Sequence, residues 1–263
     1  MQIGTYARTD EQIAYALKGK LDYIDLRMDY EHQINFREAK RILDDAGVPI
    51  TVHLPSDPEW KPTDITQDIA PFLELGQDLE AEFLTFHSPL STLLYSDDEI
   101  DLFLESFSLV YDASKEMGVK LAIETLIHYY TELILFFDQF SEVKMVLDIG
   151  HGQILSSQNR VMSHIDSFFD KIEMINVHDN SACDSYKDDI AKRVLSEISH
   201  IELREMARKC DEHLPIGEGT IDFEPIFRSL KQRGYDGRFL MLSRDPLAFQ
   251  SERKKFLKLW LSA

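Results

Sequence analysis

Strand-length apolar runs alternate with helix-length amphipathic stretches along the whole chain, and this alternation limits the folds open to it. Several of the apolar runs have no polar break, which is typical of strands that are covered on both faces. The predicted strands are Gln2–Ala7, Tyr23–Met28, Ile50–Leu54, Phe83–His87, Lys120–Thr125, Lys144–Asp148, Met174–His178 and Arg238–Leu242.

The stretches between these runs carry helix start and stop signals. Thr9 and Asp10 offer a cap at the first of them, and Gly47 and Gly118 follow two others as stop signals. The predicted helices are Thr9–Lys18, Phe36–Ala46, Asp64–Leu79, Asp97–Met117, Thr131–Phe140, Val161–Phe169, Glu224–Gln232 and Pro246–Leu261.

Eight strands, each followed by a helix, predict an α/β protein with a single (β/α)₈ TIM barrel. The rival is a doubly wound open sheet, which usually has a glycine-rich turn after its first strand, whereas Gly4 stands alone there. The chain of 263 residues has no linker or composition shift, so we expect one domain over residues 1–263.

Residues 181–210 interrupt the alternation where a connection is usually short. Within them Asp188–Lys209 is helix-like and highly charged, so we expect a helical insertion after the seventh strand. Its role is open between a solvated surface insertion and a lid or oligomer contact over the site.

Charge and composition exclude several protein classes. Asp plus Glu exceeds Lys plus Arg by 19, which argues against broad binding to nucleic acid, because each phosphate contact needs a cation. No apolar run is long enough to span a membrane, and Met1–Asp10 lacks the features of a signal peptide, so we expect a cytoplasmic protein with no membrane partner. Cys183 and Cys210 are too few for a disulfide framework and are expected as free thiols.

Imidazoles and carboxylates gather where the predicted strands end. The carboxyl ends of barrel strands form the mouth at which TIM-barrel enzymes act. A lone histidine there is more often a satisfied polar cap than a ligand, but donors at successive strand ends predict a site for a divalent cation. The candidates are His53, His87, Glu124, Asp148, His151, His178, Asp211 and His213.

Four motifs in this series resemble the xylose isomerase-like TIM barrel superfamily, which holds sugar phosphate isomerases and epimerases together with endonuclease IV. The motifs are Ile123-Glu124, Leu147-Asp148-Ile149-Gly150-His151, Val177-His178-Asp179 and His213-Leu214-Pro215-Ile216-Gly217-Glu218-Gly219-Thr220-Ile221-Asp222-Phe223.

The isomerase and epimerase branch supplies our first functional expectation. There, the resemblance implies that one divalent ion is held by the counterparts of Glu124, Asp148 and His178, with a further glutamate on the eighth strand. The two glutamates move a proton beside a carbonyl, and the counterpart of His151 contacts substrate. We therefore expect a metal-dependent isomerase or epimerase of a sugar or sugar phosphate, with Glu124 and His151 as catalytic residues. The expected cofactor is Zn, Mn, Mg or Co, with no organic cofactor.

Endonuclease IV supplies the alternative, a zinc phosphodiesterase that acts on abasic DNA. The resemblance implies three zinc ions there. The counterparts of His53, His87 and Glu124 hold the first, those of Glu124, Asp148 and His178 with the last-strand glutamate hold the second, and those of His151, Asp211 and His213 hold the third. The net charge of −19 opposes this alternative, and the basic cluster Arg253-Lys254-Lys255 falls on the last helix, outside the expected mouth.

The eighth strand departs from both patterns. Ser243 stands where the family has glutamate, and Asp245, two residues on, is a further candidate ligand because it points to the same side of a strand. Without it, one-base chemistry, a slow enzyme or a degenerate ligand-binding relative remain as alternatives. Arg244 and Arg27 near the mouth either pair a substrate anion or neutralise the acidic rim.

The remaining expectations concern substrate and assembly. The partner is expected to be a small sugar or sugar phosphate, and the chain is a candidate homo-oligomer. The candidate substrate-binding residues are His53, His87, His151, His213 and Arg244.

Overall fold

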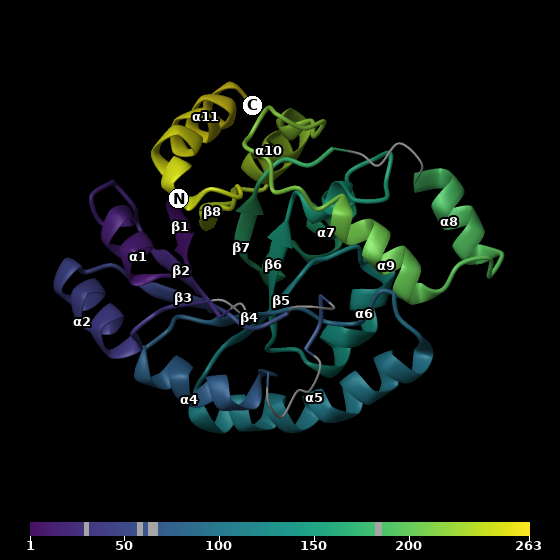
Figure 1. Cartoon of the computed structure of the whole chain (residues 1–263), viewed down its shortest axis with the longest axis horizontal. Coiled ribbons are helices and arrows are strands. Elements are labelled where there is room, and N and C mark those ends of the chain that lie inside the picture. Colours follow the sequence, from purple (N-terminus) through teal and green to yellow (C-terminus); the bar gives the residue numbers. More distant parts are fainter. Residues whose placement is uncertain (29–31, 57–59, 63–67, 182–185) are drawn as a thin grey trace.

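Eight parallel strands form a closed barrel in sequence order, with helices around it (Figure 1), which confirms the predicted TIM barrel. The computed structural model describes residues 1–28, 32–56, 60–62, 68–181 and 186–263. The barrel closes where β1 pairs with β8, with Ile3 opposite Phe239. The strands are β1 Gln2–Ala7, β2 Ile24–Arg27, β3 Ile50–His53, β4 Leu84–Phe86, β5 Leu121–Glu124, β6 Lys144–Asp148, β7 Ile172–Val177 and β8 Arg238–Met241.

The helices begin and end close to the predicted boundaries. Thr9 caps α1 by accepting a hydrogen bond from the Gln12 amide, and Gly47 and Gly118 end α2 and α5 in the left-handed conformation. Residues 64–67, at the start of the predicted helix Asp64–Leu79, lie outside the described residues. The helices are α1 Asp10–Ala16, α2 Phe36–Ala46, α4 Ala70–Asp78, α5 Asp97–Met117, α6 Tyr130–Gln139, α7 Val161–Phe168, α8 Tyr186–Val194, α9 His200–Lys209, α10 Phe223–Gln232 and α11 Phe249–Ser262, with short 3₁₀ turns η1 His151–Gln153, η2 Phe169–Lys171 and η3 Pro246–Ala248.

Side chains alternate between the barrel interior and the layer under the helices. On β5 and β6, Ala122 and Val146 belong to the interior cluster, whereas Ile123 and Leu147 belong to the larger core outside the barrel. Because the alternation has a period of two, the next inward positions are Glu124 and Asp148. The fold therefore aims these two carboxylates into the barrel at its carboxyl end.

Arg238 crosses the opposite end of the barrel. Its guanidinium binds Glu173 at 3.0 Å and also Glu82, and it lies 6.0 Å and 5.7 Å from the ring centres of Tyr23 and Phe83. These contacts hold a guanidinium among two carboxylates and two aromatic rings at the amino end of the barrel.

The insertion after β7 consists of two helices, α8 and α9, rather than the one stretch predicted for Asp188–Lys209. The helical conformation is interrupted at Ser196, whose φ is +59°. A new helix begins after Ser199, which forms a reciprocal capping box with Glu202. Helix propensity and the pattern of charged residues continue through this interruption, so the Ser-x-x-Glu spacing is the one sequence signal that predicts the new helix.

Helix α9 packs against the loops that follow β4 and β5. Leu203 and Ala207 are fully buried in a second hydrophobic cluster with Leu94 and Leu126. Arg204 is also buried, donates a hydrogen bond to the Leu94 carbonyl at 3.2 Å, and is 4.8 Å from the Tyr95 ring centre. The insertion therefore has its own core on the barrel and is not merely a solvated surface element.

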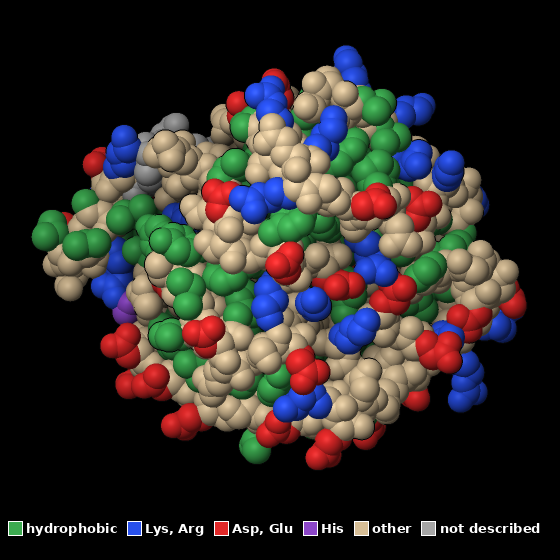
Figure 2. Space-filling model, turned by 180° about the vertical axis from the view of Figure 1, so that it is seen from behind, with side chains coloured by type: hydrophobic (Ala, Val, Ile, Leu, Met, Phe, Trp, Pro, Cys, Tyr) green, Lys and Arg blue, Asp and Glu red, His purple; other side chains and the backbone are tan. Residues whose placement is uncertain are grey.

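Cys210, which ends α9, is disulfide-bonded, so the expected free thiol is wrong there, while Cys183 lies outside the described residues. None of the helices in the described part of the chain has the length and apolar content that a membrane crossing needs. On the face shown in Figure 2, Lys and Arg side chains are interspersed with Asp and Glu, and no continuous basic surface is seen.

Candidate metal centre

Buried imidazoles and carboxylates converge at the carboxyl end of the barrel. His53, Glu124 and Asp148 are the last residues of β3, β5 and β6, and His87 and His178 follow β4 and β7 directly. Among the described residues, the ligand atoms form three groups, within each of which all atoms lie within 4.8 Å of one another. The first donor group is His53, His87 and Glu124, the second is Glu124, Asp148 and His151, and the third is His151, His178, Asp211 and His213.

In the first donor group, the three side chains cannot provide every ring nitrogen and carboxylate oxygen with a hydrogen-bond partner. The Nε2 atoms of His53 and His87 lie 3.2 Å and 3.1 Å from the Glu124 oxygens and 3.3 Å from each other. Both Nδ1 atoms are buried without a hydrogen-bond partner in the described structure. Two imidazoles turned toward one carboxylate fit a bound cation better than a hydrogen-bond network.

Backbone carbonyls orient two histidines of the third donor group. His213 Nδ1 lies 2.9 Å from the Leu242 carbonyl, and His151 Nδ1 lies 3.2 Å from the Thr125 carbonyl. Since a carbonyl only accepts, each Nδ1 carries the hydrogen. Each Nε2 then faces Asp211 Oδ2, at 3.1 Å and 3.3 Å. This arrangement is the one by which proteins orient histidine ligands toward a metal.

The third donor group also contains a strained residue. His213 has a φ of +46°, in the left-handed region that costs a non-glycine residue about 1 kcal/mol or more. Hydrogen bonds from its amide to Asn180 Oδ1 and from its ring to Leu242 hold it there. Such local strain at a cluster of donors is typical of functional sites.

His178 and Asp148 connect the second and third donor groups. His178 Nε2 lies 2.9 Å from Asp148 Oδ1, and the His178 ring stacks on that of His213 with centroids 4.0 Å apart. Asp148 Oδ2 is buried without a hydrogen-bond partner among the described residues. The expected single-ion set is thus spread over two groups, with Glu124 and Asp148 in the second and His178 in the third.

The pKa shifts indicate that the carboxylates of the cluster favour positive charge beside them. Burial by itself lowers the pKa of His151, but the carboxylates of Asp148, Asp211 and Glu124 raise it to about 10. Burial lowers the pKa of His87 and of His178, so both rings are neutral, as metal ligands must be. Carboxylates with lowered pKa values at Glu124, Asp148 and Asp211, beside the neutral rings of His87 and His178, fit a divalent ion of the zinc or manganese type. Such an ion would replace the proton that these carboxylates hold on His151.

The eighth strand supplies no carboxylate to these groups. Alternation along β8 places Leu240 and Leu242 in the barrel interior, so the inward position at its end is Leu242, one residue before Ser243. Ser243 is buried, and its carbonyl accepts a hydrogen bond from the Tyr6 hydroxyl at 2.9 Å. The expectation that Ser243 occupies the ligand position is corrected accordingly.

Asp245 and Arg244 lie beyond the end of β8 and are exposed. Asp245 caps η3 by accepting a hydrogen bond from the Leu247 amide at 2.9 Å, and it belongs to none of the three donor groups. The Arg244 amide donates to the His213 carbonyl at 2.8 Å, which ties this loop to the third donor group through the backbone.

Two asparagines that sequence reasoning missed support the donors. Asn176 donates to Glu124 Oε2 at 3.0 Å, and it lies two residues before His178, so strand alternation alone places it inside. Asn180 donates to Asp211 Oδ1 and to the Gly150 carbonyl while accepting from the amides of Glu212 and His213. Apart from that alternation, no sequence pattern signals these contacts, because they join residues 30 or more positions apart.

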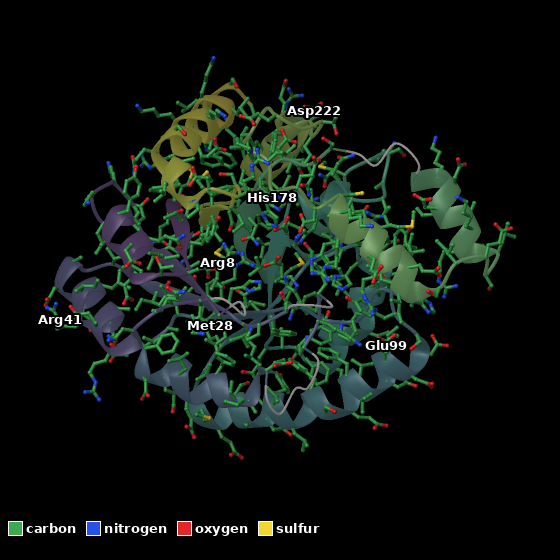
Figure 3. The ribbon with its side chains drawn as sticks, viewed as in Figure 1. Arg8, Met28, Arg41, Glu99, His178 and Asp222 are labelled. Atoms are coloured by element: carbon green, nitrogen blue, oxygen red, sulfur yellow. The ribbon has the colours of Figure 1, made fainter. Side chains whose placement is uncertain are left out.

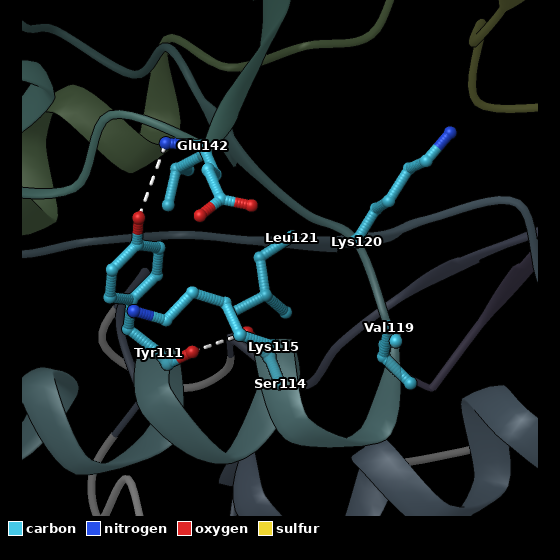
Figure 4. Close-up of a pocket in the computed structure, with 9 residues that line it drawn as sticks. Tyr111, Ser114, Lys115, Val119, Lys120, Leu121 and Glu142 are labelled. Atoms are coloured by element: carbon cyan, nitrogen blue, oxygen red, sulfur yellow. Dashed lines mark hydrogen bonds between the residues drawn. The ribbon is translucent and has the colours of Figure 1, made fainter.

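A cavity of about 220 Å³ opens beside the donors. His87, His151, Asp211 and His213 line it, together with Arg8, Arg27, Arg208, Ser56 and Trp60. Figure 3 shows Arg8 and His178 near the centre of the view and Arg41 at its periphery. Another cavity, of about 210 Å³, lies between the end of α5 and Glu142 (Figure 4) and contains none of the donors.

Comparisons with known proteins agree with this fold. The family model described as xylose isomerase-like TIM barrel matches residues 13–258. A protein of Methanocaldococcus jannaschii described as uncharacterized protein MJ1614 is 24% identical over 177 residues, which are 64% of this chain. The chain spans 57% of that relative's length.

Two solved structures are similar over the whole chain. A D-tagatose 3-epimerase-like protein is 20% identical with a TM-score of 0.70, and the similarity covers 100% of this chain and 99% of that one. The IOLI protein with a bound zinc atom is 14% identical with a TM-score of 0.71 and the same coverage. At these identities the similarity establishes the fold.

Proposed function

Because the chain belongs to the xylose isomerase-like TIM barrel family, we propose that it is a divalent-metal-dependent isomerase or epimerase of a sugar or sugar phosphate. The observation that carries this proposal is the convergence of Glu124, Asp148 and His178 with their neighbours at the carboxyl end of the barrel. The epimerase-like neighbour supports a sugar as the substrate, and the zinc-bound neighbour supports a metal.

The second donor group and His178 would hold the catalytic ion. A bound divalent ion supplies Lewis-acid polarisation of carbonyl and hydroxyl oxygens. Neutral imidazoles among the donors favour zinc, manganese or cobalt over magnesium. A cytoplasmic location and a small-molecule partner remain part of this proposal.

Glu124 is the proposed base. Burial by itself raises its pKa, but His87 and His53 hold it well below the usual range, so the carboxylate is ionised. The amide of Asn176 orients it by binding Oε2. His151 lines the cavity and is the proposed substrate contact. Since Leu242 fills the inward position of β8, we propose that Glu124 removes the proton from one carbon and returns it to the neighbouring carbon from the same face, which is isomerisation with one base.

Solvent exchange tests this proposal more directly than product assays. Metal-loaded protein in D₂O is expected to place deuterium beside the carbonyl of a ketose or ketose phosphate, which proton NMR detects. Glu124→Gln is expected to slow the exchange about 10²–10⁴-fold, the range for loss of a general base. Glu80→Gln, on an exposed side chain, is the control. If none of the ketoses tested exchanges deuterium, the proposal is contradicted.

A phosphoester hydrolase with several ions is the second candidate. The first and third donor groups favour it, because an isomerase with one ion has no use for His53, His87, Asp211 and His213 as ligands. Elemental mass spectrometry on protein purified without chelator separates the two. About three zinc ions per chain with cleavage of an abasic duplex supports the hydrolase, whereas about one ion supports the isomerase. A protein that takes up no metal contradicts both.

A further inference from the structure

Three arginines from separate parts of the chain line the cavity that contains the metal donors. Arg8 follows β1, Arg27 ends β2, and Arg208 lies in the last turn of α9. The chain as a whole carries a net charge of −19, so three guanidiniums on one small cavity run against its average charge. The three guanidiniums outnumber the one carboxylate, that of Asp211, among the residues that line the cavity.

Each arginine is positioned by its own element. Arg27 occupies an inward position on β2 and is 5% exposed. Arg8 lies over the Tyr6 ring, with its guanidinium carbon 4.8 Å from the ring centre. Both also make contacts within the protein, as does Arg208, and these contacts restrict how the guanidiniums move. An ordered guanidinium presents its donors in a fixed fork that matches a carboxylate or a phosphate.

Arg208 reaches the cavity because the insertion is packed against the barrel. Ala207, its neighbour, and Leu203, one turn earlier, are fully buried, and Arg204 binds the Leu94 carbonyl. These contacts turn one face of α9 to the barrel and bring Arg208 to the cavity. A charged helix that served only as a solvated connection would not need this packing.

We propose that this cavity binds a small substrate through an anionic oxygen group, a phosphate or a carboxylate, and that Arg8, Arg27 and Arg208 recognise it. The insertion after β7 then has a defined role, which is to supply Arg208 to the site. This inference relies on the proposed function for the reaction that follows binding, but the binding itself requires only the arginines.

Binding of inorganic phosphate and of D-gluconate tests the inference by isothermal titration calorimetry. The full chain is used both after chelator treatment and after zinc loading, so that binding to metal is separated from binding to arginine. At least one anion is expected to bind in both states, and the tighter of the two identifies the group. Arg208→Met and Arg8→Met are each expected to weaken binding roughly ten- to hundredfold, as for loss of one charge-assisted hydrogen bond.

Two further variants guard the result. Arg208→Lys keeps the charge but loses the fork and is expected to bind with intermediate affinity. Arg41→Met removes an exposed guanidinium on α2 and is expected to bind as the wild type does. Circular dichroism confirms folding, and Arg8 and Arg208 are both only partly buried, so their replacement leaves the core intact.

The inference is overturned if neither anion binds, if anions bind only after zinc loading, or if Arg208→Met and Arg8→Met bind as tightly as the wild type. These results differ from failure of the proposed function. Deuterium exchange into neutral D-fructose without anion binding leaves the isomerase intact and removes the anion site. Arginine-dependent anion binding without deuterium exchange in any sugar leaves the anion site intact and contradicts the proposed isomerase.

Discussion

The α-carbon of Gly150 lies against the imidazole ring of His178, and a Cβ at Gly150 would fall 2.0 Å from Cε1 and 2.4 Å from each ring nitrogen. Real side chains do not approach this closely, so any residue other than glycine displaces the ring or the loop. The imidazole ring of His178 contacts Asp148 and stacks on the ring of His213. Glycine at this position is therefore part of how the donors are packed.

Replacing Gly150 with alanine is expected to lower the metal content, because His178 must move away from Asp148. The overpacking should also cost about 1–3 kcal/mol of stability. Elemental mass spectrometry and urea unfolding measure the two effects. Gly118→Ala is the control, since its added methyl group meets nothing within 4 Å while its φ of +70° is unfavourable. It should cost about 1 kcal/mol without loss of metal.

Leu242→Glu is expected to place a carboxylate beside the second donor group. The inward direction of Leu242 predicts tighter metal binding by about tenfold, and a second base predicts faster solvent exchange. Ser243→Glu, one residue further, should produce neither effect, because Ser243 is not the inward position. Calorimetric metal titration compares the two variants, and equal affinities would show that β8 has a different register from the one described.

Asn180→Asp is expected to weaken the third donor group selectively. The new carboxylate faces Asp211 Oδ1 and the Gly150 carbonyl, to which the asparagine now donates at 3.1 Å and 3.0 Å. Loss of such a supporting contact typically lowers metal affinity by about 10–100-fold. Asn35→Asp, at the cap of α2, should leave affinity unchanged, because aspartate caps a helix equally well. Metal titration in which both variants match the wild type would refute this role.

His164 is expected to make the protein acid-sensitive. Burial and, less strongly, the charge of Arg160 lower its pKa from 6.5 to about 4, although its hydrogen bond from Nδ1 to the Arg160 carbonyl at 3.0 Å opposes this shift. The folded state resists protonation that the unfolded chain accepts, so stability is full above pH 6.5 and is lost as the pH falls. The loss should reach about 3 kcal/mol near pH 4.

His164→Asn tests this expectation because it keeps a donor but removes the titrating ring. The stability difference between wild type and variant, measured by urea unfolding, should move in favour of the variant between pH 7 and pH 4.5. An unchanged difference across this range would show that His164 does not titrate in this way.

Much of the fold was readable from residue order. Runs such as Lys144–Asp148 are apolar enough to mark buried strands, and glycines such as Gly47 and Gly118 mark helix ends, because a left-handed backbone favours them. These signals are local, so they appear in the sequence. The break at Ser196 inside the insertion was missed, because charge and propensity run on through it.

The sequence by itself also determined which side chains reach the barrel mouth, because a parallel barrel sends every strand end to one side. Only the tertiary structure decided how they group. The division into three donor groups, the tautomers set by Thr125 and Leu242, and the arrival of Arg208 from α9 depend on contacts between distant segments. Whether Leu242 or Ser243 faces inward also required the structure, since a shift of one residue reverses the direction of a strand side chain.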